Sequence, residues 1–204
     1  MKKYTYLSLS RYLTELSSKK PVPGGGSVSA YVACLGIGLA EMVAGIGIEK
    51  ASSEAKSSIR RAVRLLQKAR RDALQVVDLD PRVYQSVMKS YKTTRTLSDP
   101  ERKRRVIDEA LENSFRLQAD LALLVAMAKE AAESLNGMIQ GSIMNDLGIS
   151  VKLLEAAFQG AYDTARINMI YMKDPQRKNR AEQALEELKK RFETTSVTGN
   201  ATGN

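Results

Sequence analysis

The chain has no histidine and only one cysteine, Cys34, in 204 residues. Without histidine there is no Ser-His-Asp triad, no Cys-His pair and no zinc enzyme of the usual kind. A single cysteine excludes an internal disulfide and a cysteine-based metal cluster. We therefore expect no metal site, and any acid–base chemistry must use carboxylates, lysine, tyrosine or Cys34.

Aromatic residues are also scarce, at 5% of the chain with no tryptophan, while hydrophobic residues make up 43%. A core of alanine and aliphatic residues suits close helix packing better than a β-sandwich. No segment shows the alternation that is typical of a strand. We predict an all-α fold, with one antiparallel helical bundle over residues 1–193 and a polar tail over 194–204 that we expect to be disordered.

The start of the chain lacks the apolar region of a signal peptide, so the cytoplasm is the expected location. The net charge of +9 favours a solvated basic surface first, an anionic small ligand second and nucleic acid third. The basic residues are spread over several segments and form no recognition motif. We expect no nucleic-acid partner.

One apolar run, "VSAYVACLGIGLAEMVAGIGI", is long enough to span a bilayer, for which about 20 residues suffice. It contains Glu41, and small residues such as Ala33, Gly36 and Ala40 recur every three or four positions. Such a face lets another helix approach closely, in a soluble bundle as well as in a membrane. We favour a bundle centre or a dimer interface over a membrane span.

Three Asp-Pro pairs predict helix starts, because aspartate is a preferred N-cap and proline suits the first helical position. The pairs are Asp80-Pro81, Asp99-Pro100 and Asp174-Pro175. Together with the hydrophobic periodicity they predict helices over about 8–18, 27–48, 53–77, from 81 onward, 100–136, 146–172 and 175–193.

The loop "PVPGGGS" ends where the long apolar helix is predicted to begin. Free amides at a helix N-terminus, with glycines that let a ligand approach, would form an anion or carbonyl site. The alternative is a tight turn with Ser27 as the N-cap, which spacing alone favours. The loop is not a P-loop, because no Gly-Lys-Ser/Thr ending follows.

Two further stretches carry candidate acids. In "DPRVYQSVMKSYK", Asp80 is an N-cap candidate, and Tyr84 lies one turn later on the same side. In "NDLGIS", Asp146 is either a cap or a buried acid or base whose pKa is set by its pocket, and the residues leave the two readings evenly balanced.

In their order along the chain, "PVPGGGSVSAYVACLGIGLAEMVA", "DPRVYQSVMKSY" and "NDLGISVKLLEAAFQGAYDTARINMIYMKD" resemble the cyclodeaminase family. This family comprises the C-terminal half of formiminotransferase-cyclodeaminase and small bacterial methenyltetrahydrofolate cyclohydrolases. The resemblance covers roughly Leu7 to Asp174. It implies an all-helical homodimer that binds a tetrahydrofolate derivative as substrate, with no permanently bound cofactor.

The resemblance implies one of two related reactions. In one, formiminotetrahydrofolate closes its ring and loses ammonia; in the other, water opens methenyltetrahydrofolate to formyltetrahydrofolate. Both need proton transfer and no metal. Carried over to this chain, the catalytic candidates are Asp146 and Asp80. The folate-binding candidates are Pro23, Gly24, Gly25, Gly26, Ser27, Tyr84, Asn145, Lys89 and Lys92.

Several positions depart from the family pattern. Asn145 stands where the family usually has serine, and Ser142 and Thr164 stand where asparagine is usual. A second hypothesis therefore stays open, in which the chain is a non-catalytic helical dimer that binds a different ligand or a protein partner.

Overall fold

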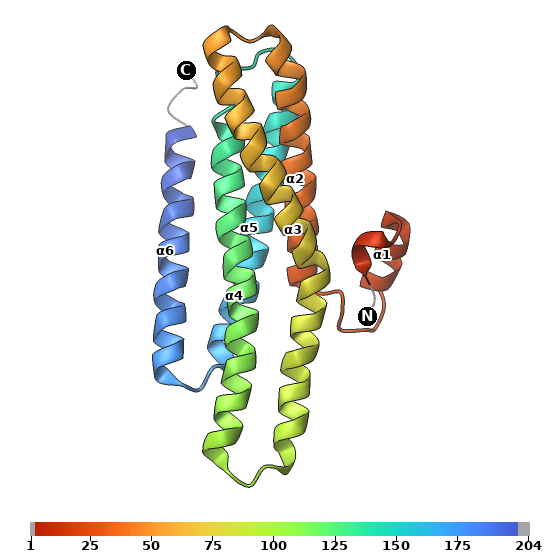
Figure 1. Ribbon diagram of the computed structural model, residues 1–204, viewed down its shortest axis with the longest axis vertical. Coiled ribbons are helices and arrows are strands. Elements are labelled where there is room, and N and C mark those ends of the chain that lie inside the picture. Colours follow the sequence, from red (N-terminus) through yellow and green to blue (C-terminus); the bar gives the residue numbers. More distant parts are fainter. Residues whose placement is uncertain (1–2, 200–204) are drawn as a thin grey trace.

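The structure is a computed structural model that describes residues 3–199, with side chains through residue 193 (Figure 1). It contains six α-helices among the described residues: α1 Leu9–Leu16, α2 Gly25–Gly47, α3 Ser53–Thr93, α4 Pro100–Glu133, α5 Met144–Tyr171 and α6 Pro175–Gly199. Short 3₁₀ turns cover Tyr4–Tyr6, Ile48–Lys50 and Thr94–Thr96. No β-strand occurs in this part of the chain, so the all-α prediction is confirmed.

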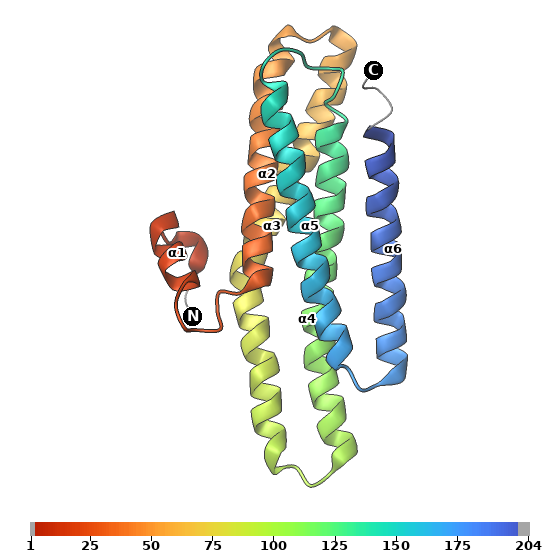
Figure 2. The same cartoon turned by 180° about the vertical axis from the view of Figure 1, so that it is seen from behind.

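Helices α2 to α5 form an antiparallel four-helix bundle, in which α2 packs against α3 and α5, and α4 packs against the same two helices (Figures 1 and 2). Helix α6 lies along the outside of α4 and α5, while α1 projects from the side of the bundle. The predicted antiparallel bundle is confirmed.

Helix α2 buries one face of small and aliphatic residues in the centre of the bundle, including Ala30, Ala33, Ile37, Ala40 and Ala44. These small side chains let α3 and α5 approach closely. Among the described residues, Gly25–Lys50 is also the one stretch long and apolar enough to cross a membrane, a criterion that core helices of soluble proteins meet as well.

Two of the three predicted helix starts are confirmed. The Asp99 carboxylate accepts hydrogen bonds from the amides of Glu101 and Arg102 at the start of α4. Asp174 accepts from the amides of Gln176 and Arg177 in the first turn of α6. Both carboxylates therefore satisfy amides that have no acceptor within their own helix.

The third predicted start, at Asp80-Pro81, is wrong: α3 runs without a break through Pro81. Proline has no amide to donate to the carbonyl of Val77, one turn earlier. The hydroxyl of Ser27 on α2 donates to that carbonyl instead, at 3.0 Å. A contact from another helix thus replaces the hydrogen bond that Pro81 removes.

Two helix ends also differ from the prediction. Helix α2 begins at Gly25 with Gly24 as its N-cap residue, so Ser27 lies inside the first turn and is not the cap. Helix α6 continues to Gly199, past Glu193 where its end was predicted. Residues 194–199, part of the tail for which we predicted disorder, therefore belong to α6. The rest of that tail, residues 200–204, lies outside the described residues.

The helices of the bundle have unequal lengths, and this inequality positions a cavity. Helix α2 begins opposite Asp80, but α3 continues from Pro81 to Thr93. This extension of α3 is about 20 Å long at 1.5 Å per residue. Helix α4 runs beside this extension, so these parts of α3 and α4 project beyond the start of α2 and the end of α5, and residues of all four helices line one cavity (Figure 1).

Candidate functional site

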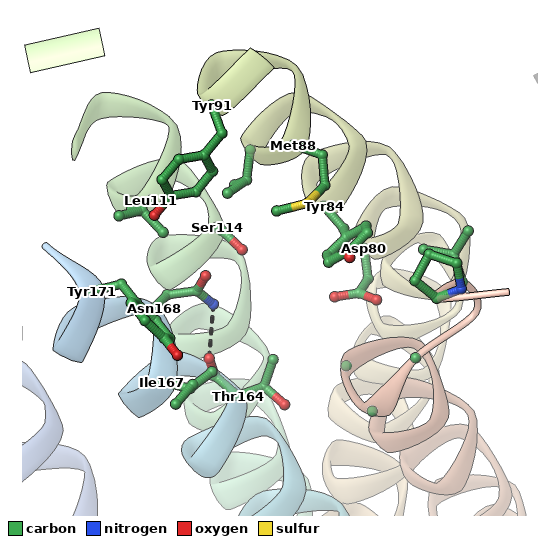
Figure 3. A pocket seen from close by; sticks show the side chains of 16 residues that line it. Asp80, Tyr84, Met88, Tyr91, Leu111, Ser114, Thr164, Ile167, Asn168 and Tyr171 are labelled. Atoms are coloured by element: carbon green, nitrogen blue, oxygen red, sulfur yellow. Dashed lines mark hydrogen bonds between the residues drawn. The ribbon is translucent and has the colours of Figure 1, made fainter. Parts of the chain in front are cut away.

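A cavity of about 500 Å³ occupies this space (Figure 3). Its volume lies within the usual range for small-molecule sites. Its walls come from the loop and first turn of α2 (Pro21, Val22, Gly24, Gly25, Gly26), from α3 (Asp80, Tyr84, Val87, Met88, Tyr91), from α4 (Leu111, Ser114) and from α5 (Thr164, Ile167, Asn168, Tyr171).

The carboxylate of Asp80 lies in the wall of this cavity and is held by two donors. The backbone amide of Ser27 donates to Oδ2 at 3.1 Å, and Nε2 of Gln118 on α4 donates to Oδ1 at 2.8 Å. Asp80 therefore caps the start of α2 from a different helix, at the positive end of the α2 dipole. Three helices meet at this one side chain.

Gly26 makes this arrangement sterically possible. A Cβ atom at this position would lie 2.2 Å from Oδ1 of Asp80 and 2.2 Å from Nε2 of Gln118. At Gly25 a Cβ atom would lie 3.7 Å from Oγ1 of Thr164, which is an ordinary contact. The amides of Gly25 and Gly26 have no acceptor within α2, and both glycines line the cavity.

The opposite wall is polar where α5 ends. The Thr164 hydroxyl donates to the carbonyl of Gly160, and the side-chain amide of Asn168 donates to the carbonyl of Thr164 at 2.8 Å (Figure 3). The buried carboxylate of Asp108 accepts from the amides of Lys173 and Asp174 and so anchors the turn that follows α5. This anchor fixes the direction in which the last turns of α5 face the cavity.

Burial raises the pKa of Asp80 above its ordinary value, while the amide of Ser27 and the side chain of Gln118 act in the opposite direction. Burial also raises the pKa of Tyr91, with smaller contributions from Asp108 and Tyr171. The cavity thus contains a desolvated carboxylate beside neutral hydroxyl and amide groups. Such a carboxylate is suited to accept a proton from a bound molecule and to return it.

The structure brings most of the loop and α3 candidates together. Gly24, Gly25, Gly26, Asp80 and Tyr84 all line the cavity. The side chain of Ser27 is buried behind it, donating to Val77, and only the Ser27 amide reaches Asp80. Pro23 is buried next to the lining residues.

The remaining candidates do not line this cavity. Lys89 and Lys92 are exposed on α3, next in sequence to the lining residues Met88 and Tyr91. Asn145 and Asp146 lie in the first turn of α5, at the opposite end of that helix. The helix rises about 27 Å between Asp146 and Thr164, at 1.5 Å per residue. Within one chain, Asp146 and Asp80 are therefore not neighbours.

Sequence reasoning missed the contribution of α4. Ser114 lines the cavity and Gln118 holds Asp80, and both side chains are buried. They occupy the same helical stripe as the buried residues Leu111, Leu121 and Val125. Two polar residues on a stripe that faces the core are the signal that would have indicated them.

The described residues contain no group of three histidine, cysteine, aspartate or glutamate side chains that could hold a metal ion. The cavity offers one carboxylate, several hydroxyls, one side-chain amide and the amides at the start of α2. This set is suited to hold a flat, polar ring and to move a proton to or from it.

Known proteins are similar to this chain in sequence and in fold. Residues 8–187 match the family described as formiminotransferase-cyclodeaminase. The chain is 28% identical to formimidoyltransferase-cyclodeaminase of Mus musculus over 192 residues, or 93% of this chain and 36% of that protein. It is 30% identical to the Gallus gallus protein of the same name over 183 residues, or 88% of this chain and 34% of that protein. The chain thus spans about a third of the length of these curated relatives.

The fold is similar to a crystal structure of formiminotetrahydrofolate cyclodeaminase from Thermotoga maritima. The TM-score is 0.84 at 23% sequence identity, and the match covers 95% of this chain and 94% of that one. At this identity the similarity establishes the helical fold.

Proposed function

Because the chain belongs to the formiminotransferase-cyclodeaminase family, we propose that it acts on a one-carbon derivative of tetrahydrofolate in the cavity beside Asp80. The observation that carries this proposal is the partly buried Asp80 carboxylate, held by Ser27 and Gln118 at the wall of a cavity of suitable volume. The family accounts for the folate, and the carboxylate accounts for the proton transfers.

The first candidate reaction is hydrolysis of a methenyl group. The methenyl carbon lies between two nitrogens and carries an amidinium cation, which a carboxylate attracts. Water attacks this carbon and gives its proton to Asp80, while the electron pair of the C–N double bond moves to nitrogen. The proton then passes from Asp80 to the leaving nitrogen as its bond to carbon breaks. The new hydroxyl releases its proton to solvent as the C=O bond forms, which leaves a formyl group and the regenerated carboxylate.

The second candidate reaction is cyclodeamination, and it uses the same carboxylate. The formimino group reacts as its protonated cation, with two hydrogens on the terminal nitrogen. The free amine nitrogen of the folate attacks the formimino carbon, the C=N electron pair moves to the terminal nitrogen, and the amine loses its proton to Asp80. Asp80 returns that proton to the departing nitrogen, which leaves as ammonia. Both reactions pass through a tetrahedral carbon, so one positioned acid–base group serves either of them.

The charge of Asp80 determines which part of the ligand the loop amides hold. An anionic group at Gly25 and Gly26 would be repelled by the neighbouring carboxylate. We therefore assign these amides to a pterin carbonyl and not to the carboxylates of the folate tail. The exposed ammonium groups of Lys89 and Lys92 attract that anionic tail outside the cavity.

We also propose a homodimer, formed through the outer face of α2. Val28, Val32, Leu35, Leu39, Met42 and Ile46 recur at alternating spacings of four and three, as in a coiled-coil seam. Leu35 and Ile46 are 54% and 55% exposed. A Cβ atom at Gly38 or Gly45, beside this stripe, would contact nothing within 4 Å. A second copy of the same face fits such a surface.

We propose that the two copies of α2 run antiparallel about a two-fold axis, so that the α2 N-terminus of one chain lies beside the α2 C-terminus of its partner. Helix α5 begins at the end of the bundle where α2 ends (Figure 2). The first turn of α5, which contains Asn145 and Asp146, would then approach the cavity of the other chain. This geometry is how Asp146 could take part in the reaction.

One observation favours the alternative function, a dimer that binds a ligand or partner without catalysis. Thr164, which lines the cavity, stands where the family usually has asparagine. A changed cavity wall suits a non-catalytic helical dimer of the same fold that binds a different ligand or a protein partner.

The test is turnover by the purified protein. Loss of methenyltetrahydrofolate is followed by ultraviolet absorbance, and ammonia release is measured with formiminotetrahydrofolate. The proposal expects turnover in at least one assay and a loss of about a hundredfold or more in Asp80→Asn, the usual effect of removing a general acid or base. Folate binding without turnover in either assay would support the alternative, a dimer that binds without catalysis.

A further inference from the structure

Gln118 is the largest polar contribution of α4 to the site, and its side chain is wholly buried. Nε2 donates to Oδ1 of Asp80 at 2.8 Å. Oε1 is also buried and has no hydrogen-bond partner among the described residues. The side-chain amide is therefore engaged with Asp80 and with nothing else that the structure describes.

A purely structural role does not explain this residue well. A buried polar atom without a partner costs free energy, and an apolar side chain of the same size would avoid that cost. Gln118 occupies a stripe of α4 on which Leu111, Leu121 and Val125 are buried hydrophobic residues. What distinguishes its position from theirs is the contact with a carboxylate at the cavity wall.

We propose that Gln118 is the positioning residue of the site: it fixes one oxygen of Asp80, so that the carboxylate stays ionised and faces the bound ligand. The importance of this for turnover rests on the function proposed above. The Ser27 amide fixes the other oxygen, so the carboxylate plane is held from two helices. Gly26 leaves the space in which the two side chains meet.

The two ends of the amide also match the two protonation states of Asp80. Nε2 donates to the ionised carboxylate. When Asp80 has taken a proton, rotation of the amide by half a turn brings Oε1 into position to accept from the carboxylic acid. The stronger, charge-assisted bond is the one to the carboxylate, so Gln118 favours the ionised form on balance.

The test is a titration of Asp80 by carboxyl carbon NMR, with the signal assigned through its absence in Asp80→Asn. Gln118→Met keeps the volume and removes the donor, and the expected result is a rise of about one unit in the pKa of Asp80. Ser114→Ala changes the neighbouring turn of α4 without touching Asp80 and is the control, in which the pKa stays at the wild-type value. A folded Gln118→Met protein with an unchanged Asp80 pKa overturns the proposal.

Gln118→Glu is the second variant and covers the case in which methionine prevents folding. Two adjacent carboxyls cannot both ionise freely, so the pair should titrate with one apparent pKa well above that of wild-type Asp80. An unchanged titration of Asp80 in this variant also overturns the proposal.

The same titration separates this proposal from the proposed function. If the wild type turns over folate, the acidic limb of its pH profile for kcat/KM shifts upward in Gln118→Met by the same amount as the NMR pKa. If the pKa of Asp80 measured by NMR rises in Gln118→Met but the acidic limb of the kcat/KM profile does not move, the role of Gln118 in turnover is overturned. Absence of turnover in the wild type defeats the proposed function, while the NMR result still decides whether Gln118 holds Asp80 ionised.

Discussion

At the scale of single residues, Asp80 is held in a state that its burial disfavours. Burial raises the pKa of Asp80, and the contacts with Ser27 and Gln118 lower it only in part. A carboxyl whose pKa is raised by folding destabilises the native state above that pKa, and this cost disappears below the pKa of the unfolded chain. The native state therefore carries a cost at neutral pH that is linked to the site.

This cost predicts how Asp80→Asn responds to pH. Asparagine can accept from the Ser27 amide and, after rotation of the Gln118 amide, donate to Oε1, so the variant should fold. We expect its melting temperature at pH 7 to equal or exceed that of the wild type. The difference should shrink as the pH falls towards about 4, where unfolded aspartate takes up its proton. Thermal unfolding across this range checks it, and a variant markedly less stable at pH 7 would contradict it.

Gly26 gives a second prediction at this scale, with a matched control one residue away. Gly26→Ala places a methyl group 2.2 Å from both Asp80 and Gln118, so these side chains must separate. Gly25→Ala adds the same methyl group at 3.7 Å from Thr164. We expect Gly26→Ala to lower turnover at least about tenfold more than Gly25→Ala, because it displaces a group involved in proton transfer. Equal effects of the two variants would show that the close approach at Gly26 is unimportant.

At the scale of helices, α2 and α3 are joined where Pro81 interrupts the hydrogen bonding of α3. The Ser27 hydroxyl donates to the Val77 carbonyl, which can only accept, so the hydroxyl of Tyr12 must donate to Ser27 at 3.2 Å. This chain of hydrogen bonds links α1, α2 and α3 directly behind Asp80. It satisfies the Val77 carbonyl, which Pro81 leaves without its helical donor, and α3 stays helical through this residue.

The contact can be tested by a double-mutant cycle. Ser27→Ala leaves the Val77 carbonyl unpaired and should lower the free energy of unfolding by about 1–3 kcal/mol. In a Pro81→Ala background the new amide of residue 81 reaches that carbonyl, so Ser27→Ala should cost less, with a coupling of about 1 kcal/mol. Denaturant unfolding of the four proteins measures the coupling, and simple additivity would show that Ser27 does not compensate for the amide that Pro81 lacks.

The elements also show what the sequence could and could not predict. Periodicity and the Asp99 and Asp174 caps predict most helices because these signals are local. The Asp80-Pro81 pair gave a wrong helix start because Ser27, which contacts this part of α3, is distant in sequence. The role of Gln118 could not be predicted for the same reason: the two polar residues on the α4 stripe indicate buried polar groups, but only the fold shows which helix faces them.

At the scale of the whole molecule, the exposed stripe of α2 predicts how two chains associate. Leu35→Glu places a charge in the stripe and should convert the dimer to a monomer. Met127, which is 43% exposed on α4, lies on the helix diagonally across the bundle from α2, so Met127→Glu is the matched control and should stay dimeric. Sedimentation without detergent measures both. A wild-type monomer would contradict the dimer. A protein that floats with lipid vesicles would contradict it as well and would favour binding to a membrane surface.

The same dimer predicts complementation between two variants. Asp80→Asn and Asp146→Asn chains should each be impaired, since each site would use Asp80 of one chain and Asp146 of its partner. After the chains are mixed and exchanged, half of the dimers contain one intact site, so about a quarter of wild-type turnover should return. No recovery would contradict a site shared between the two chains, and full activity of Asp146→Asn alone would remove Asp146 from the reaction.

The most direct measurement is the turnover of methenyltetrahydrofolate and formiminotetrahydrofolate by the wild type and by Asp80→Asn, side by side. We expect the wild type to turn over at least one substrate, and a folded Asp80→Asn protein to be slower by about a hundredfold or more. Equal turnover by both proteins would contradict the role of Asp80. Folate binding without turnover by the wild type would show that the cavity serves as a binding site only.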